Sequence, residues 1–328
     1  MPVTSVVQAH QLLQARRVQD AAEVLRSAAE AGDASAAMEL AVWLLRGDVV
    51  VRDLPSARAW LRRAVQIGHV DGALMEIALT ANGSGGRADW TLALRRLQQA
   101  AKGDPIATQQ LDLISTMRLA PDGNPRSLPD AERLSAAPLV RRFPAFITPA
   151  EAHHIAATVV AMLQPATVFD PANNRMVAHP IRSSDNAAIG PTQETLVIQA
   201  INRRIAVATG TQLTCGEPLT VLRYAPGQQY RPHLDTLSNT TNQRTTTAIL
   251  YLSDDYRGGE TIFPLLDLEV RARAGDLLVF DNVDATGAPD PRSRHAGNPV
   301  QTGTKWIATR WIRKDPISPW DLSDEARR

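Results

Sequence analysis

The side chains best suited to chemistry are His233 and Asp235, which stand two residues apart in the segment Tyr224–Asp235. In an extended segment, residues two apart point to the same face, so this imidazole and this carboxylate would enter one cavity. They would supply two of the three ligands of the facial triad that holds iron(II) by one face and leaves the opposite positions open. Because a His-x-Asp pair often occurs by chance, the hypothesis needs further elements.

The third ligand must come from elsewhere in the chain, which contains seven histidines. His295 is the best candidate, because it lies downstream, just before the last long strand that the sequence predicts. The sequence therefore predicts an iron site of His233, Asp235 and His295. The other histidines are expected in helices, in helix turns or in a loop before the strands: His10, His69, His153, His154 and His179.

A lysine in the last predicted strand strengthens this hypothesis. Lys305 follows His295 by ten residues and begins a run that alternates like a strand. An ammonium group that faces an apolar cavity is costly unless an anion meets it. The distal carboxylate of 2-oxoglutarate would be that anion. Alternation places four residues of the run on one face, namely Lys305, Ile307, Thr309 and Trp311.

The elements that must position these groups are short strands. From about Arg182 onwards, runs rich in Thr, Val, Ile and aromatic residues are separated by Gly, Pro, Asn and Asp. Several short strands with turn residues between them predict a sandwich or jelly roll. The clearest runs are Leu219–Tyr224, Arg244–Leu252, Leu277–Phe280 and Lys305–Arg313. The segment Asp284–Arg294, rich in Pro, Gly and Asp, is expected to be a surface loop, with a mobile lid as the alternative.

The first part of the chain predicts helices instead. It is rich in Ala, Leu, Arg, Gln and Glu, with apolar residues at helical spacing. Leu25, Leu61 and Leu97 recur every 36 residues, and each is followed by a short break that contains glycine. Such a period predicts helical hairpins stacked as a solenoid. The segment resembles Sel-type tetratricopeptide-like repeats, which implies either a concave surface for a protein partner or a cap that stabilises the neighbouring domain.

Four prolines between residues 121 and 138 punctuate the middle of the chain. Such a density of helix breakers predicts a linker at 121–138, between a helical repeat domain at 1–120 and a second domain at 139–315. Residues 316–328 are expected to form a C-terminal tail.

A helix should begin the second domain. Thr148 can cap it, Pro149 suits its first position, and Glu151 stands three residues after the cap. This pattern predicts a helix that runs through Met162.

The composition is that of an ordinary soluble globular protein. Of the 328 residues 44% are hydrophobic and 21% are charged, and the formal net charge is +1. This charge gives no reason to expect nucleic acid or a membrane as a partner. The single cysteine, Cys215, cannot form an intramolecular disulfide, and the first twenty residues lack the apolar core of a secretory signal. We therefore expect a cytoplasmic protein.

Residues 139–315 resemble the catalytic domain of prolyl 4-hydroxylases, within the iron and 2-oxoglutarate dioxygenase superfamily. The motifs that carry this resemblance recur in order along the chain. They are Arg182-Ser-Ser, Tyr224–Asp235, Gln243–Leu252, Gly258–Thr261, Gly275-Asp276, Val279-Phe280, His295–Val300 and Gly303–Trp306. The resemblance implies a double-stranded β-helix, or jelly roll, with flanking helices. With the helical repeats, the whole chain would be an α+β protein.

The resemblance also implies roles for further side chains. Tyr224 and Thr261 would hydrogen-bond 2-oxoglutarate, and Lys305 would pair with its charge. The substrate side would be lined by Tyr230, Arg244 and Trp311. The residues themselves leave alternatives open, because the two aromatic rings could be core packing and Arg244 could pair with an acid.

The implied activity is that of an iron(II)- and 2-oxoglutarate-dependent dioxygenase. Such an enzyme would hydroxylate a C–H bond, and the leading hypothesis is that this bond belongs to a peptidyl proline in a protein substrate recruited in part by the repeats. Dioxygen would be consumed and succinate and carbon dioxide released, with ascorbate as a supporting cofactor. Two alternatives remain, namely the same chemistry on another side chain or a small molecule, and a catalytically silent binding module.

Overall fold

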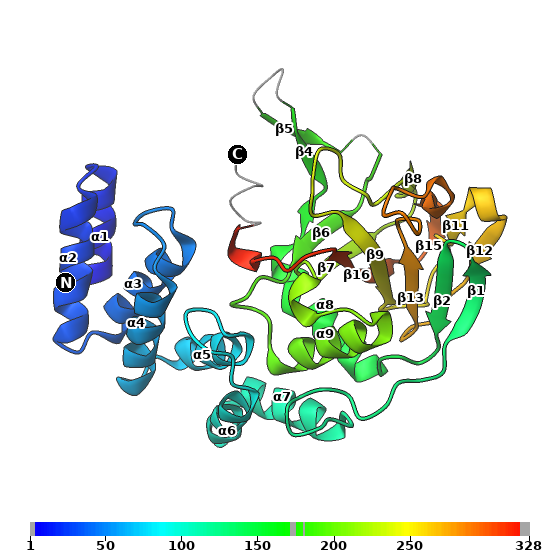
Figure 1. Ribbon diagram of the computed structural model, residues 1–328. Helices are drawn as coiled ribbons and strands as arrows, with labels where there is room; N and C mark the ends of the chain where they lie inside the picture. The colour runs from blue at the N-terminus through cyan, green and yellow to red at the C-terminus, as the bar shows by residue number, and fades with distance from the viewer. Residues whose placement is uncertain (1–3, 171–174, 180, 322–328) are drawn as a thin grey trace. The chain divides into compact units, whose positions relative to one another are not determined.

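The computed structural model describes residues 4–170, 175–179 and 181–321. The chain divides into two compact units, one of residues 1–116 with 191–199, the other of residues 117–190 with 200–328. Helices build the first unit and antiparallel sheets dominate the second, so the chain has the α+β organisation that the sequence predicts (Figure 1). Among the described helices, none is long and apolar enough to cross a membrane.

The first unit is a series of helices joined by short turns, in which consecutive helices pack as antiparallel pairs. Leu25, Leu61 and Leu97 occupy equivalent places on the even-numbered helices and are fully buried. The predicted 36-residue repeat is therefore a repeat of core positions. The helices are α1 (Ser5–Gln14), α2 (Val18–Glu30), α3 (Ala34–Arg46), α4 (Leu54–Gln66), α5 (Val70–Asn82), α6 (Trp90–Ala100) and α7 (Pro105–Thr116).

The same period governs the helix ends. Gly47 and Gly83 end α3 and α5 in the left-handed conformation, with φ of 71° and 79°. Asp53 and Asp89 cap α4 and α6 with side-chain oxygens that accept backbone N–H groups. Glycine after a helix and aspartate before one satisfy the unpaired backbone groups at helix ends. Each repeat thus carries its own stop and start signals.

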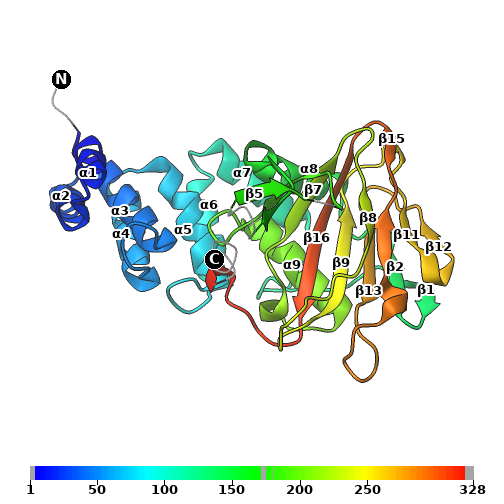
Figure 2. The same cartoon turned by 90° about the horizontal axis from the view of Figure 1, so that it is seen from above.

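The second unit is built on two facing antiparallel sheets. The larger sheet has the strand order β1-β2-β13-β9-β16-β7-β6-β3, and its central strands run side by side in Figure 2. Its strands are β1 (Glu132–Ala136), β2 (Leu139–Phe143), β3 (Gln164–Pro165), β6 (Asp185–Ala188), β7 (Thr220–Tyr224), β9 (Arg244–Tyr251), β13 (Leu277–Asp281) and β16 (Lys305–Arg313).

The smaller sheet has the order β12-β11-β14-β8. The remaining described strands form two separate pairs, β4-β5 and β10-β15. Non-consecutive neighbours in both sheets and a core between them are the features of a jelly roll. The remaining strands are β4 (Thr167–Asp170), β5 (Arg175–Ala178), β8 (Tyr230–His233), β10 (Arg257–Gly258), β11 (Thr261–Phe263), β12 (Leu268–Val270), β14 (His295–Gly297) and β15 (Val300–Thr302).

The core of this unit lies between the sheets and supports the cavity described below. Tyr251 and Ile307 contribute from the larger sheet, and Phe263 contributes from the smaller one. Phe263 stacks edge-on against Phe280, with 5.1 Å between ring centroids. Such close packing holds the facing strands at a fixed separation.

The second unit also contains α8 (Pro149–Val159) and most of α9 (Leu196–Thr209), whose first residues belong to the first unit. The predicted capping box is present, since Thr148 accepts from the Glu151 backbone N–H and Glu151 accepts from that of Thr148. The α-helix ends at Val159 and continues as a 3-10 turn to Met162.

Two expectations differ from the structure. Residues 132–136 of the segment expected to be a linker form strand β1, at the edge of the larger sheet. An edge strand pairs on one side only, and β1 is largely exposed, so it lacks the apolar alternation that would reveal a strand. Strands also begin well before Arg182, since β2, β3, β4 and β5 all precede it. Most of the expected C-terminal tail, residues 322–328, lies outside the described residues.

Candidate active site

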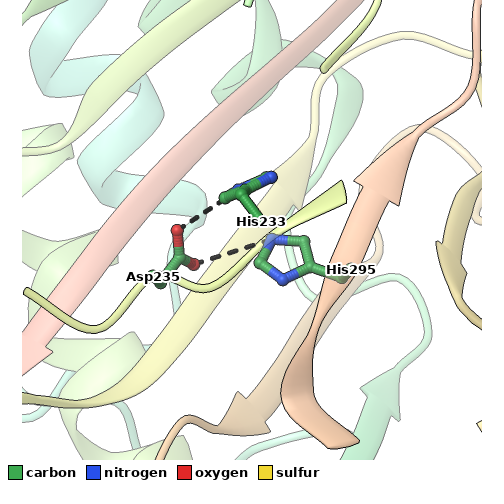
Figure 3. A group of neighbouring side chains, drawn as sticks. All are labelled: His233, Asp235 and His295. Carbon is green, nitrogen blue, oxygen red and sulfur yellow. Dashed lines mark ion pairs between the residues drawn. The ribbon is translucent and has the colours of Figure 1, made fainter. Parts of the chain in front are cut away.

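His233 and His295 are brought together by the pairing of β8 with β14. The two residues are direct partners across these antiparallel strands, although 62 positions separate them in the sequence. Asp235 follows β8 and points back at both imidazoles (Figure 3). Its Oδ1 lies 3.5 Å from Nε2 of His233, and its Oδ2 lies 3.7 Å from Nε2 of His295. The candidate ligand atoms all lie within 4.8 Å of one another, and all three residues are buried.

Backbone carbonyl groups fix the orientation of both imidazoles. Nδ1 of His233 donates to the carbonyl oxygen of Arg231 (2.8 Å), and Nδ1 of His295 donates to that of Ser293 (3.1 Å). A carbonyl can only accept, so Nδ1 carries the proton and Nε2 is left with a free lone pair. Nε2 of His233 is buried and has no hydrogen-bond partner among the residues that the structure describes. Burial lowers the pKa of His295 to about 4, so its ring is neutral near pH 7.

Asp235 is held by a chain of hydrogen bonds that sequence reasoning missed. The Thr247 hydroxyl donates to Oδ2 of Asp235 (2.7 Å), and the Asn282 side-chain amide donates to the Thr247 hydroxyl (2.9 Å). Burial would raise the pKa of Asp235, but the two imidazoles and this hydroxyl outweigh it and hold that pKa below its ordinary range. The sequence could have indicated Thr247 by alternation, because Thr247, Ile249 and Tyr251 are two residues apart in one strand and point to the same face.

Lys305 lies on the opposite wall of the same cavity and is 3% exposed. Its ammonium donates to the carbonyl oxygen of Gly259 (2.6 Å) and lies 5.7 Å from the ring centroids of Tyr224 and Tyr251. Burial lowers the pKa of Lys305 to about 8. An ammonium in such surroundings is well placed to meet an anion that enters the cavity.

The two side chains expected to hydrogen-bond the co-substrate, Tyr224 and Thr261, line the same cavity as Lys305. Tyr224 pairs with Lys305 across β7 and β16, and it is 4% exposed. The hydroxyl groups of Thr261 and Tyr251 are 2.7 Å apart in a buried hydrogen bond. Sequence reasoning singled out Tyr224 and Thr261 but missed Tyr251, which ends strand β9 just behind them.

The residues expected on the substrate side lie at the same cavity or beside it. The Tyr230 ring stacks on His233, with 3.5 Å between centroids and 15° between planes. Trp311 lines the cavity, and the Arg244 guanidinium lies over its ring at 4.2 Å. Arg244 makes two hydrogen bonds of 2.7 Å to the carboxylate of Glu217. Arg244 therefore pairs with an acid, which was the alternative that the sequence left open for this residue.

The cavity occupies about 420 Å³, including its open mouth. The alternation predicted for β16 is correct, because its alternate residues from Lys305 to Trp311 all face this cavity. The lining is Leu222, Tyr224, Tyr230, His233, Asp235, Ile249, Thr261, His295, Ala296, Gly297, Lys305, Ile307, Thr309 and Trp311. Every candidate site residue except Arg244 is among these.

Residues 284–289 form an exposed surface loop, and the second half of the segment 284–294 is partly buried. Asp290 and Ser293 are buried within it, and Asp290 caps a short 3-10 helix, Pro291–Ser293. The segment leads directly into His295 and supplies the carbonyl group that orients this ring. The end of this segment therefore supports His295 beside the cavity.

Comparison with known proteins identifies the family of the second unit. Residues 219–313 match the model of the 2OG-Fe(II) oxygenase superfamily. Prolyl 4-hydroxylase 1 of Arabidopsis thaliana is 35% identical over 192 residues, which cover 53% of this chain and 68% of that protein.

Two solved structures are similar in part. Viral collagen prolyl hydroxylase from Paramecium Bursaria Chlorella virus-1, in its 2OG complex, is 26% identical over 53% of this chain and 95% of that chain, with a TM-score of 0.43. A Sel1 repeat protein from Oxalobacter formigenes is 26% identical over 33% of this chain and 85% of that chain, with a TM-score of 0.30.

The sequence match to the Arabidopsis protein extends well beyond the metal-site motif and covers more than two thirds of that relative. By that match this chain belongs to the prolyl 4-hydroxylase family of the 2OG-Fe(II) oxygenases, and it is an iron(II)- and 2-oxoglutarate-dependent dioxygenase.

Proposed function

We propose that this protein hydroxylates a peptidyl proline of a protein substrate, with release of succinate and carbon dioxide. The observation that carries the proposal is that the His233–Asp235–His295 cluster and the buried Lys305 line one cavity. The name shared by the relatives, prolyl 4-hydroxylase, is the reason to choose proline as the target.

The residues present fit iron(II). Two imidazoles and a carboxylate are the donor set of the facial triad that this ion takes in oxygenases. Within the described part of the chain, the buried Nε2 of His233 has no hydrogen-bond partner, and a metal ion would satisfy it. His233, Asp235 and His295 would hold the ion, while the carbonyl groups at Nδ1 keep both rings aligned.

The part of the cavity wall formed by Lys305, Tyr224 and Thr261 fits 2-oxoglutarate. Lys305 would pair with the distal carboxylate of this dianion, and the hydroxyl groups of Tyr224 and Thr261 would hydrogen-bond it. When bound, iron(II) and 2-oxoglutarate supply the oxidising chemistry that turns dioxygen, 2-oxoglutarate and substrate into hydroxylated substrate, succinate and carbon dioxide. The protein orients the reactants and excludes bulk water from a cavity with apolar walls such as Leu222 and Ile307.

Tyr230 and Trp311 would hold the proline ring at the mouth of the cavity. Both offer flat apolar surfaces, and aromatic faces suit a compact saturated ring. Tyr230 also stacks on His233, so one side chain would hold both the substrate and a metal ligand. Arg244 would act from beside the cavity, since Glu217 fixes its guanidinium over the Trp311 ring.

The first test removes one proposed metal ligand. In His233→Ala the cluster loses an imidazole, and we expect succinate release with iron(II) and 2-oxoglutarate to fall at least about 100-fold. His153→Ala is the matched control, because His153 is exposed on α8, and it should keep wild-type turnover. Equal succinate release from the wild type and His233→Ala would refute the metal assignment.

The second test concerns the substrate. The purified protein is incubated with proline-containing peptides, and mass spectrometry looks for the gain of one oxygen atom on proline. Succinate release without any such gain, over a broad peptide set, would favour another side chain or a small molecule. No 2-oxoglutarate turnover under any condition would favour the catalytically silent binding module, against which the complete ligand cluster argues.

We further propose that ascorbate sustains turnover and that the protein works in the cytoplasm. Ascorbate follows from the family resemblance, and a reducing compartment suits a chain whose single cysteine, Cys215, is buried and unpaired in any disulfide. We also propose that the helical repeats help to recruit the protein substrate. Turnover with and without ascorbate, and fractionation of source cells with an antibody, test the first two proposals.

A further inference from the structure

The helical repeat unit contains a groove formed by α4, α5 and α6. Its floor is aliphatic, from Val65, Ala73, Ile77 and Ala100, and polar or charged residues complete the lining, namely Arg62, Gln66, Glu76, Arg96 and Gln99. The groove occupies about 670 Å³, including its open side. An open apolar groove on a helical repeat surface is a typical place for a peptide side chain to bind.

A buried carboxylate lies at the base of this groove. Glu76 is 3% exposed and receives two hydrogen bonds from Arg58, of 2.7 and 2.8 Å. Arg58 is itself buried, and it also donates to the carbonyl oxygens of Leu79 (3.0 Å) and Ser84 (2.8 Å). Arg58 therefore neutralises Glu76 inside the helix layer, and this pair is structural.

Two more arginines converge on the same carboxylate from the groove side. Arg96 donates to Glu76 and to the Thr80 hydroxyl (2.8 Å), and its side chain is 32% exposed. Arg62 lies 3.9 Å from Glu76 and is 45% exposed. Three guanidinium groups thus share one carboxylate, which leaves two formal positive charges beside an aliphatic floor. Such a surface favours an anion that also carries apolar groups.

We propose that this groove binds an acidic, aliphatic segment of a partner polypeptide. A carboxylate of the partner would lie between Arg62 and Arg96, since guanidinium groups bind carboxylates through paired hydrogen bonds. A leucine, isoleucine or valine side chain of the partner would cover Val65 and Ala73, which are partly exposed. The aliphatic floor distinguishes this ligand from a phosphate backbone, which gains nothing from apolar contact.

The test uses the full-length protein and a fluorescein-labelled dodecapeptide of alternating glutamate and leucine. We expect fluorescence anisotropy to give a Kd on the order of 10–100 µM, as for modest peptide grooves. Arg62→Gln with Arg96→Gln should weaken binding at least about tenfold. A peptide with glutamine in place of glutamate, and one with serine in place of leucine, should each bind at least about tenfold more weakly.

Arg95→Gln is the matched control, because Arg95 is exposed on the same helix as Arg96 and lies outside the lining of the groove. It should bind the peptide like the wild type. Arg62→Gln alone is the second variant, should the double variant melt at a lower temperature than the wild type, and it should weaken binding severalfold. Absence of wild-type binding at about 1 mM peptide, equal loss in Arg95→Gln and Arg62→Gln, or displacement of the peptide by duplex DNA would each overturn the proposal. These measurements require no turnover, so they stand apart from the proposed activity.

Discussion

Among single residues, Thr247 contacts a proposed metal ligand without being a ligand itself. Its hydroxyl is fully buried and links the Asn282 amide to Oδ2 of Asp235. This hydrogen bond keeps the carboxylate turned so that both imidazoles face it. Partners of metal ligands are commonly nearly as important as the ligands, because they set orientation and charge.

Thr247→Val should lower metal affinity while it preserves side-chain shape. Asp235 would lose a donor and Asn282 an acceptor, and we expect the Kd for manganese(II), a stand-in for iron(II), to rise about 10-fold or more. Thr247→Ser keeps the hydroxyl and should bind nearly as well as the wild type. Calorimetric titration of the metal-free protein checks both, and an unchanged Kd in Thr247→Val would show that the hydroxyl does not matter.

Lys305 should make the binding of 2-oxoglutarate depend on pH. Burial lowers its pKa to about 8, so the ammonium that attracts the dianion is present below this pH and is lost above it. In the wild type, the KM for 2-oxoglutarate should be constant at low pH and should rise up to about tenfold per pH unit above about 8.

Lys305→Met is the matching variant, because it keeps the chain length without the charge. Its KM for 2-oxoglutarate should be raised at every pH, on the order of 100-fold near pH 7, and should lack the rise above pH 8. Succinate release measured between about pH 6.5 and 9.5 gives both profiles. The assignment fails if the variant retains the wild-type profile.

At the scale of secondary-structure elements, the turn between β15 and β16 positions Lys305. Gly303 lies in this turn with φ of +76°, and a Cβ atom there would lie 2.2 Å from the carbonyl oxygen of Asp255. Only glycine can combine this conformation with so close an approach of another backbone. The turn therefore sets the register in which β16 presents alternate residues to the cavity.

Gly303→Ala should destabilise the protein far more than Gly287→Ala. Gly287 has φ of +84°, but a Cβ atom there meets nothing within 4 Å. The two substitutions share the cost of a left-handed alanine, about 1–2 kcal/mol, and differ in the backbone clash. We expect Gly303→Ala to lower the melting temperature by several degrees more, as measured by scanning calorimetry. Equal shifts would mean that the turn yields easily.

At the scale of the whole molecule, the chain has a helical unit and a sheet unit, each with its own buried core. The proposed metal and co-substrate sites lie entirely in the sheet unit. Ligand binding stabilises the part of a protein that binds it, by an amount set by ligand concentration relative to Kd. The two units should therefore respond differently to ligands.

Manganese(II) with 2-oxoglutarate, added without oxygen, should raise one of two calorimetric unfolding transitions. At about 100 times the Kd the stabilisation is about 2.7 kcal/mol, which corresponds to several degrees for a unit of this size. Removal of the metal with a chelator should reverse the shift, and the transition of the helical unit should stay fixed. A shift of both transitions together would show that the units unfold as one.

The sequence alone determined the features that repeat or alternate within a continuous segment. Leu25, Leu61 and Leu97 recur every 36 residues because each is a buried core position of its own repeat. The capping box depends only on Thr148 and on Glu151, three residues later. The alternation of β16 likewise places Lys305 and Trp311 on one face without knowledge of its neighbours. These features could be predicted because they arise from the geometry of a single helix or strand.

Only the tertiary structure decided which distant segments meet. The β8–β14 pairing sets His295 opposite His233, and the packing of β13 beside β9 brings Asn282 to Thr247. The partner of Arg244, which the sequence left open, is Glu217, because the Glu217 backbone N–H bonds to Trp311 of β16 and β16 pairs with β9, which begins at Arg244. Strand order and register depend on the whole core, and residue types in one segment do not encode them.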